Sequence, residues 1–455
     1  MVSHDSLDIV RLSVKPAMPR RPPGLTPPRY ARRMGRMWQI SSLSNGLTVV
    51  TVPMPHARSV GVALVYGVGA CHEPDELAGM SHFVEHLCFK GTPRRPSPKD
   101  ISSEIEGVGG ILNGGTGREE TAYFAKVSRA HWPMAVDLLF DMTQNSLFDS
   151  AEIDKERRVV IEEIRMNLDI PQQRVGMLID ALLWPGQPLG RDIAGTMETV
   201  STISRGQLVT HLKQHYLPSN LVVGVAGNVE HDAVCEEALR HSASITLPAP
   251  DRRYKVDVAQ DAPRIEIDRR EGEQTHLCIA VHGVSRLDER RFVTDIMNVV
   301  LGGGMSSRLF LEVRERKGLA YDIHSYTEHF ASSGSVIIYA GVEPARLNEC
   351  IRAVVMELGR IREGARPEEL ARAKELSKGR LELRLEDTQN AAMWYAYQQL
   401  LNGEILPVEE VCARIDTVTS AEIEQLAAQL LSTSQLNVAV VGPVEGEIPE
   451  DLLRI

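Results

Sequence analysis

The sequence repeats itself at one fixed offset, and this repeat strongly limits the folds open to a chain of 455 residues. The stretch VSTISRGQL at 200–208 has the pattern of IDTVTSAEI at 415–423, and NLVVGVAGNV at 220–229 resembles NVAVVGPV at 437–444. FDSAEIDKERRVVIEEI at 148–164 resembles ARPEELARAKELSKGRLEL at 365–383. All three offsets are about 215–217 residues, which predicts two copies of one domain of roughly 200 residues.

The repeat also predicts the domain boundaries. We expect one domain over residues 37–244 and its homologue over residues 263–455. Residues 245–262 contain prolines and charges without hydrophobic periodicity and are the expected linker. Residues 1–36 are rich in Arg and Pro and are expected to form a disordered basic arm. Proline at this density prevents the amphipathic helix of a mitochondrial transit peptide.

Composition narrows the class of protein further. A net charge of −11 argues against general affinity for nucleic acid, and no apolar run is long enough to span a membrane. The six cysteines are scattered and form no C-x-x-C pair, which suits a reducing compartment. We therefore expect a cytoplasmic protein with no nucleic-acid or membrane partner.

Each repeat mixes strands with helices. The β-branched runs GLTVVTVP, SVGVALVYGVG and TAYFAKVS read as strands, and consecutive strands could pair as hairpins. The stretch HWPMAVDLLFDMTQNSLF reads as a helix. Because strands and helices come in blocks, the expected fold class is α+β. Each domain is expected to be a mostly antiparallel sheet with helices packed on one face.

The stretch AGMSHFVEHLCFKGT at 78–92 contains the pattern H-x-x-E-H. On a helix, His82, Glu85 and His86 share one face, and histidines at i and i+4 can bind one metal ion. The same pattern occurs in one class of zinc protease, with the Glu as general base. An isolated pair of this kind is more often the solvated polar face of a helix, so a further ligand is required to favour a metal site.

A second helix, predicted from Asp149 to about Pro171, offers that ligand. Glu156 and Glu163 are seven residues apart and share a face, whereas Glu162 points about 100° away from Glu163. The alternative is an ordinary charged surface helix. Two histidines and one glutamate would leave the fourth position open, as catalytic zinc requires.

These motifs resemble the short-chain branch of the pitrilysin, insulysin and mitochondrial processing peptidase family. The resemblance covers residues 38–450 and rests on HFVEHLCFKGT, ERRVVIEEI, NGGTGREETAYFAKV and RLFLEVRERKGLAY. It implies a Zn²⁺-dependent metalloendopeptidase with His82, His86 and Glu163 as ligands. Glu162 also has tolerable spacing from His86, and only the helical phase with Glu156 favours Glu163.

The resemblance also implies roles for residues outside the ligand set. Glu85 is expected to be the general base, and Glu156 to orient a ligand or assist proton transfer. Arg314 and Tyr321, seven apart and expected on a helix or its end, would stabilise the oxyanion. The residues expected to contact the peptide substrate are Phe83, Asn113, Gly114, Thr116 and Gly303. Gly302, Gly303 and Gly304 are expected to form a mobile loop facing the substrate.

The resemblance further implies how the protein assembles. The first repeat carries the metal set and the second carries the Arg–Tyr pair, so a homodimer that closes a chamber around an extended peptide is expected. The alternative is a non-proteolytic scaffold or core subunit, but such members usually lose the metal ligands. Two positions that are acidic in processing peptidases are Gln173 and Met177 here, which argues against specificity for presequences.

Overall fold

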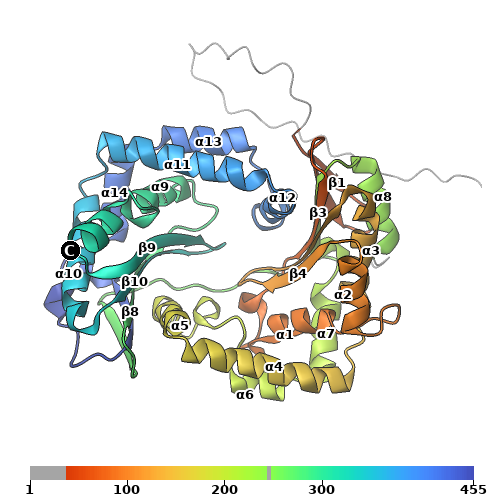
Figure 1. Cartoon of the computed structure of the whole chain (residues 1–455), viewed down its shortest axis with the longest axis horizontal. Helices are drawn as coiled ribbons and strands as arrows, with labels where there is room; N and C mark the ends of the chain where they lie inside the picture. Colours follow the sequence, from red (N-terminus) through yellow and green to blue (C-terminus); the bar gives the residue numbers. More distant parts are fainter. Residues whose placement is uncertain (1–36, 243–246) are drawn as a thin grey trace, which may run out of the picture.

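The computed structural model describes residues 37–242 and 247–455. The expected basic arm, residues 1–36, lies outside the described residues. Residues 243–246, at the expected junction of first domain and linker, also lie outside them. Figure 1 shows two halves, each built from one sheet and its helices.

The first half contains a six-stranded sheet in the order β1-β2-β6-β3-β5-β4. Its strands are β1 (Gln39–Ser42), β2 (Thr48–Pro53), β3 (Ser59–Tyr66), β4 (Ile111–Thr116), β5 (Thr121–Ser128) and β6 (Leu221–Gly227). Only β2 and β6 run parallel. β1–β2 and β4–β5 form antiparallel hairpins. Of the predicted strands, β3 pairs with β5 in antiparallel fashion. The expected pairing of β2 with β3 is wrong, because the late strand β6 lies between them.

The second half contains a five-stranded sheet in the order β7-β11-β8-β10-β9. Its strands are β7 (Arg264–Arg269), β8 (Thr275–Gly283), β9 (Ala320–His329), β10 (Gly334–Val342) and β11 (Asn437–Gly442). Again one pair is parallel, β7 with β11, and the other pairs are antiparallel. β11 is inserted between β7 and β8 as β6 is between β2 and β3, so the two halves share one topology.

Helices cover one face of each sheet. Around the first sheet lie α1 (Met80–Cys88), α2 (Pro98–Glu106), α3 (Trp132–Gln144), α4 (Ser150–Asp169), α6 (Met197–Thr202), α7 (Arg205–His215) and α8 (His231–His241). Around the second lie α9 (Arg291–Gly302), α10 (Leu347–Ile361), α11 (Pro367–Leu385), α13 (Val408–Thr417) and α14 (Ser420–Leu430). Each set encloses one large apolar core with its sheet. The expected α+β class is therefore confirmed.

The shorter helical segments connect these elements. The 3-10 turns are η1 (Ala70–His72), η2 (Asp75–Leu77), η3 (Arg129–His131), η4 (Pro188–Gly190), η5 (Pro218–Asn220), η7 (Pro344–Arg346), η8 (Thr433–Gln435) and η9 (Glu450–Leu453). The segment η6 (Phe310–Arg316) is π-helical.

The opposite face of each sheet is covered by a helix from the other half. Helix α5 (Pro171–Leu183) packs on the second sheet, with Val175 and Ile179 buried beside Ala280. Helix α12 (Thr388–Asn402) packs on the first sheet, as Figure 1 shows. A Cβ at Gly224 would lie 2.3 Å from the Ala392 carbonyl oxygen, so the absence of a side chain there permits this close packing. Because each half contributes a helix to the sheet of the other, the two halves pack against each other through two buried apolar clusters.

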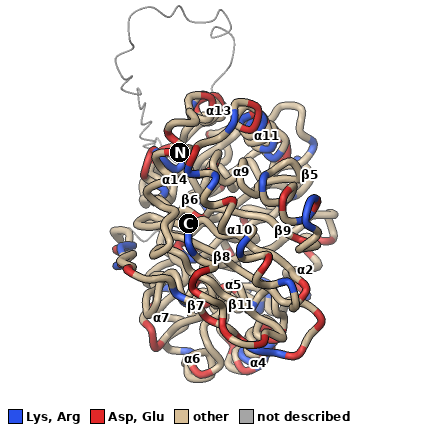
Figure 2. The backbone as a smooth tube through the Cα atoms, turned by 90° about the vertical axis from the view of Figure 1, so that its left-hand side faces the viewer, with Lys and Arg blue, Asp and Glu red and all other residues tan. Residues whose placement is uncertain are grey.

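The charge distribution and the character of the helices both bear on possible partners. Figure 2 shows Lys and Arg segments interspersed with Asp and Glu segments over the face in view. Among the described residues, no helix has both the length and the apolar character needed to cross a membrane.

Candidate metal centre

Helix α1 brings the H-x-x-E-H motif to the surface of a pocket. Val84 and Leu87 are buried in the first core, whereas His82, Glu85 and His86 line a pocket of about 590 Å³. The amphipathic pattern of the motif thus predicts the orientation of this helix correctly. The proposed contact of Phe83 with substrate is wrong. Its side chain is 0% exposed in the core, with the Arg157 guanidinium carbon 5.3 Å from the ring centroid.

Helix α4 brings Glu163 against the two histidines. The Nε2 atoms of His82 and His86 are 3.2 Å apart. Glu163 Oε2 lies 3.8 Å from His82 Nε2 and 3.6 Å from His86 Nε2. Two ligand atoms about 2.0–2.1 Å from one tetrahedral ion lie roughly 3.4 Å apart. The three side chains therefore have the donor types and spacing that fit a zinc ion.

Glu162, the alternative ligand, points elsewhere. Its side chain is 72% exposed and pairs with Arg165 at 3.2 Å. Of the two candidate glutamates, Glu163 joins His82 and His86 in the cluster of potential metal ligands. The helical phase that favours Glu163 in the sequence therefore agrees with the geometry.

Glu156 lies one layer behind the cluster. Its Oε1 is 3.0 Å from His86 Nδ1, and its Oε2 is 2.7 Å from Lys90 Nζ. This contact orients the His86 ring so that Nε2 faces His82 and Glu163. His82 has no such support. Its Nδ1 is buried and has no hydrogen-bond partner among the described residues.

The surroundings set the charge of these groups. Burial, together with the neighbouring His86, lowers the pKa of His82 to about 4, so its ring is neutral at physiological pH and free to bind a metal. Burial acts in the same direction on His86, but the hydrogen bond with Glu156 and nearby carboxylates outweigh it and raise the pKa of His86. Burial also raises the pKa of Glu85, which increases its ability to accept a proton.

The edge strand β4 forms one wall of the pocket. Asn113, Gly114 and Thr116, which are predicted to contact the substrate, line this pocket. The Thr116 hydroxyl donates a hydrogen bond of 3.3 Å to Glu85 Oε2. A Cβ at Gly114 would lie 2.9 Å from Glu85 Oε1, so glycine lets this strand approach the acid closely.

The predicted residues of the second half lie outside this pocket. The Arg314 guanidinium carbon is 5.1 Å from the Tyr321 ring centroid, so the two residues are neighbours. The expectation that both lie on a helix or at its end is wrong for Tyr321, which lies in strand β9 and is 79% exposed. Neither residue lines the pocket of His82.

The glycine loop also lies outside the metal pocket and is shorter than expected. Gly302 is the buried last residue of α9, where a Cβ would meet Ser325, so the loop begins only at Gly303. Gly303 lines a separate depression beside Tyr326.

Sequence reasoning missed several polar residues of the pocket. Arg118 donates hydrogen bonds to Asp180 on α5 and to the carbonyl of Arg191. Burial, partly offset by Arg118, raises the pKa of Asp180 to about 7. The positions Gln173, Met177 and Asp180 lie on one face of α5 at i, i+4 and i+7. Helical periodicity could therefore have indicated Asp180 as a neighbour of the two singled-out positions.

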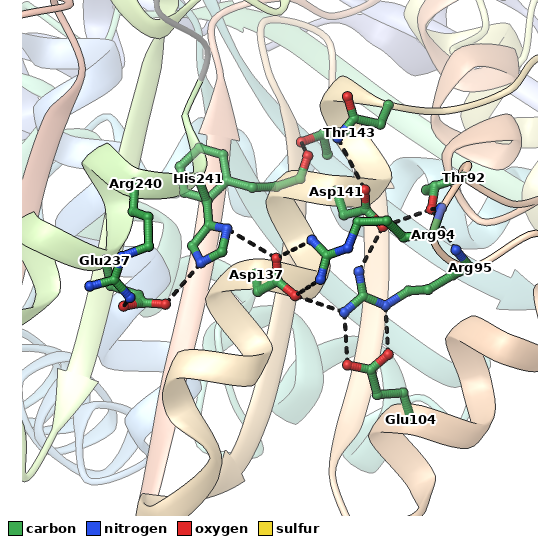
Figure 3. Close-up of polar contacts among 12 residues, drawn as sticks. Thr92, Arg94, Arg95, Glu104, Asp137, Asp141, Thr143, Glu237, Arg240 and His241 are labelled. Atoms are coloured by element: carbon green, nitrogen blue, oxygen red, sulfur yellow. Dashed lines mark hydrogen bonds and ion pairs between the residues drawn. The ribbon is translucent and has the colours of Figure 1, made fainter.

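A polar network holds the segment that follows α1 (Figure 3). Arg95 donates hydrogen bonds to Glu104, Asp137 and Asp141, and the Thr92 hydroxyl donates to Asp141 at 2.7 Å. Asp137 and Asp141 lie on α3. The network therefore ties the segment that follows α1 to the core helix α3.

Comparison with known proteins agrees with this geometry. Residues 48–197 match the model described as "Insulinase (Peptidase family M16)", and residues 202–377 match "Peptidase M16 inactive domain". An uncharacterized zinc protease of Streptomyces coelicolor is 36% identical over 412 residues, covering 89% of each chain. An uncharacterized zinc protease of Bacillus subtilis is 34% identical over 406 residues, covering 89% of this chain and 98% of the relative.

Solved structures share the fold. A protease from Helicobacter pylori superposes with a TM-score of 0.82 at 22% identity, covering 89% of this chain and 99% of the other. A peptidase M16 inactive domain from Pseudomonas fluorescens gives 0.83 at 18% identity, covering 90% and 100%. The resemblance inferred from the motifs is thus confirmed. The chain belongs to the M16 family of insulinase-type peptidases.

Proposed function

We propose that the protein is a zinc-dependent metalloendopeptidase. The observation that carries the proposal is the convergence of His82, His86 and Glu163 in one pocket with Glu85 beside them. Relatives with more than 30% identity bear the name zinc protease, which agrees with the donor set. Zinc held by such a site supplies Lewis-acid chemistry that allows a water molecule to lose a proton near neutral pH.

Different residues of the protein transfer the proton, orient the ligand and bind the substrate. Glu85 accepts the proton of the attacking water and returns it to the leaving amine. Its raised pKa and its position on α1 facing β4 suit both transfers. Glu156 orients His86 through Nδ1 and is itself held by Lys90. An extended peptide pairs with the exposed edge of β4, which brings its scissile bond past Glu85.

We further propose that two chains close around the substrate. Arg314 and Tyr321 are adjacent and exposed but lie outside the metal pocket of their own chain. A guanidinium and a phenol are suited to stabilise an oxyanion. In a homodimer this pair would reach the metal pocket of the second copy. A cytoplasmic location is part of the same proposal.

A scaffold role is the alternative. One structure with this fold comes from a Complex III2 assembly of Candida albicans, with a TM-score of 0.80 at 18% identity, covering 92% of this chain and 100% of that one. The complete set of His82, Glu85, His86 and Glu163 favours the enzyme instead, because a scaffold has no use for a general base.

The test separates metal binding from catalysis. Glu85→Gln removes the base but no ligand, so zinc content stays at one per chain. Peptide hydrolysis falls by roughly 10²–10⁴-fold, the usual contribution of general base catalysis. Hydrolysis is measured by mass spectrometry on a peptide library, with a chelator-treated sample as control. Wild-type rates in Glu85→Gln would contradict the mechanism.

A further inference from the structure

The start of the metal helix lacks the usual cap. Helix α1 begins after Gly79, which has φ of +92° and no side chain to accept a hydrogen bond from the first turn. A Cβ at Gly79 would lie 2.4 Å from the carbonyl oxygen of Ala194, so a capping Ser or Asp cannot replace it without strain. The free N–H groups of the first turn therefore need a partner from elsewhere in the chain.

Glu73 supplies that partner. Its Oε1 accepts a hydrogen bond of 2.5 Å from the backbone N–H of Ser81, and its Oε2 accepts one of 2.8 Å from that of Gly79. The residue is only 6% exposed. Burial raises the pKa of Glu73 to about 7, although the hydrogen bonds from Ser81 and Gly79 act in the opposite direction. In its ionised form the carboxylate also interacts favourably with the helix dipole. Both oxygens are thus committed to the first turn of α1.

The segment that carries Glu73 is itself clamped to the pocket wall. Arg191 lines the pocket and donates hydrogen bonds to the carbonyls of Ala70 and Glu73, at 3.0 and 2.9 Å. Its other guanidinium nitrogen contacts Asp75 at 2.6 Å. The carboxylate is therefore fixed in space and can hold the helix start in place.

The two histidines depend on this cap to different degrees. His86 lies in the second turn, and Glu156 orients its ring. His82 is the third residue of α1, directly after Ser81, in the turn most prone to fraying. Its Nδ1 has no partner among the described residues, so no hydrogen bond on that side of the ring fixes its orientation as Glu156 does for His86. The position of its Nε2 therefore depends more strongly on the backbone of the first turn.

We propose that Glu73 is a positioning residue for the metal site, acting on His82 through the backbone of Gly79 and Ser81. The inference rests on the proposed zinc function. It adds a third support to the site, beside Glu156 behind His86 and the Arg95 network after the helix. Supports of this kind typically change metal affinity by roughly 10–100-fold.

The test compares Glu73→Gln with a matched cap elsewhere. Asp387 accepts hydrogen bonds from the N–H groups of Gln389 and Asn390 at the start of α12, a helix that contributes no residue to the metal cluster. Zinc affinity is measured by competition with a chromophoric chelator. We expect a loss of roughly 10–100-fold in Glu73→Gln and wild-type affinity in Asp387→Asn.

Hydrogen exchange of the metal-free protein provides a readout that needs no zinc. In Glu73→Gln, the amides of residues 79–83 should exchange roughly 5-fold faster or more, as expected on loss of a helix cap, and those of residues 84–88 should change less. Glu73→Asp, whose carboxylate is one methylene shorter, serves if the Gln variant does not fold and should show the same pattern.

The outcomes separate this inference from the proposed function. A folded Glu73→Gln with wild-type zinc affinity and unchanged exchange at 79–83 overturns the positioning role and leaves the peptidase proposal intact. Equal loss of zinc affinity in Asp387→Asn also overturns it, because the effect would then be general destabilisation. A wild-type chain that binds no zinc overturns the proposed function and this inference together, whatever the exchange shows.

Discussion

Substituting Glu156 by Gln tests whether a residue that contacts a metal ligand, without being one, changes the zinc affinity of the site. Gln has almost the same shape, and its amide oxygen can still accept a hydrogen bond from His86 Nδ1. The negative charge is lost, however, and with it the ion pair with Lys90 at 2.7 Å and the electrostatic support of His86. Because the residue is only 6% exposed, water does not replace that charge.

The expected loss can be estimated from this arrangement. Replacing the partner of a metal-binding histidine typically lowers metal affinity by about 10–100-fold, or roughly 1.4–2.7 kcal/mol of binding free energy. Folding stability should change less, because the Lys90 side chain is 25% exposed and can turn to solvent. The unfolding midpoint of the zinc-free protein should therefore stay close to that of wild type.

The assay is a zinc titration against a chromophoric chelator at constant pH and ionic strength. Glu162→Gln is the matched control, because it removes a carboxylate from the same helix at a position 72% exposed. Wild-type zinc affinity in a folded Glu156→Gln protein would refute the reasoning. An equal loss in Glu162→Gln would refute it too, because a general charge effect would then explain both.

Three further outcomes are expected. Glu163→Gln should lose zinc, measured by elemental analysis, while Glu162→Gln retains it; the reverse result would assign the ligand to Glu162. Glu85→Gln and Tyr321→Phe should each be inactive alone, but co-expression should restore activity in up to about half of the heterodimer sites, since a twofold dimer has two equivalent sites. Heterodimers without activity would contradict sharing between chains. Burial raises the pKa of Asp137, but hydrogen bonds from Arg94 and Arg95 outweigh it and lower the pKa to about 2. Its stabilising contribution is therefore present above the unfolded pKa of about 3.9 and lost as pH falls from about 4 to about 2. In Asp137→Asn, the urea midpoint of unfolding should depend less on pH between about 4 and about 2 than it does in wild type. An unchanged pH dependence would contradict this.

Local patterns in the sequence predicted the elements of the site. Helical periodicity placed His82, Glu85 and His86 on one face and set Glu163 in phase with Glu156, and the structure shows both arrangements. The repeat predicted two halves of one topology. These inferences succeed because they depend on 3.6-residue and two-residue periods, which the backbone geometry imposes wherever a helix or strand forms.

Other features depend on contacts between residues distant in the chain. Nothing in the repeat indicates that α5 covers the second sheet and α12 the first. The periodicity of a helix shows that one of its faces is buried, but not which sheet buries it. Phe83 lies inside the ligand motif, yet it is part of the core because the helix must bury one face.

Glu73 shows, at a single residue, the difference between what the local sequence predicts and what tertiary contacts decide. In the sequence it is one acid in a polar turn, six residues before Gly79. Only the fold brings its carboxylate onto the N–H groups of Gly79 and Ser81. Periodicity determines which side chains share a face, but the partner of a buried polar group is decided by tertiary packing, because any donor or acceptor that the chain path brings within about 3 Å can satisfy it.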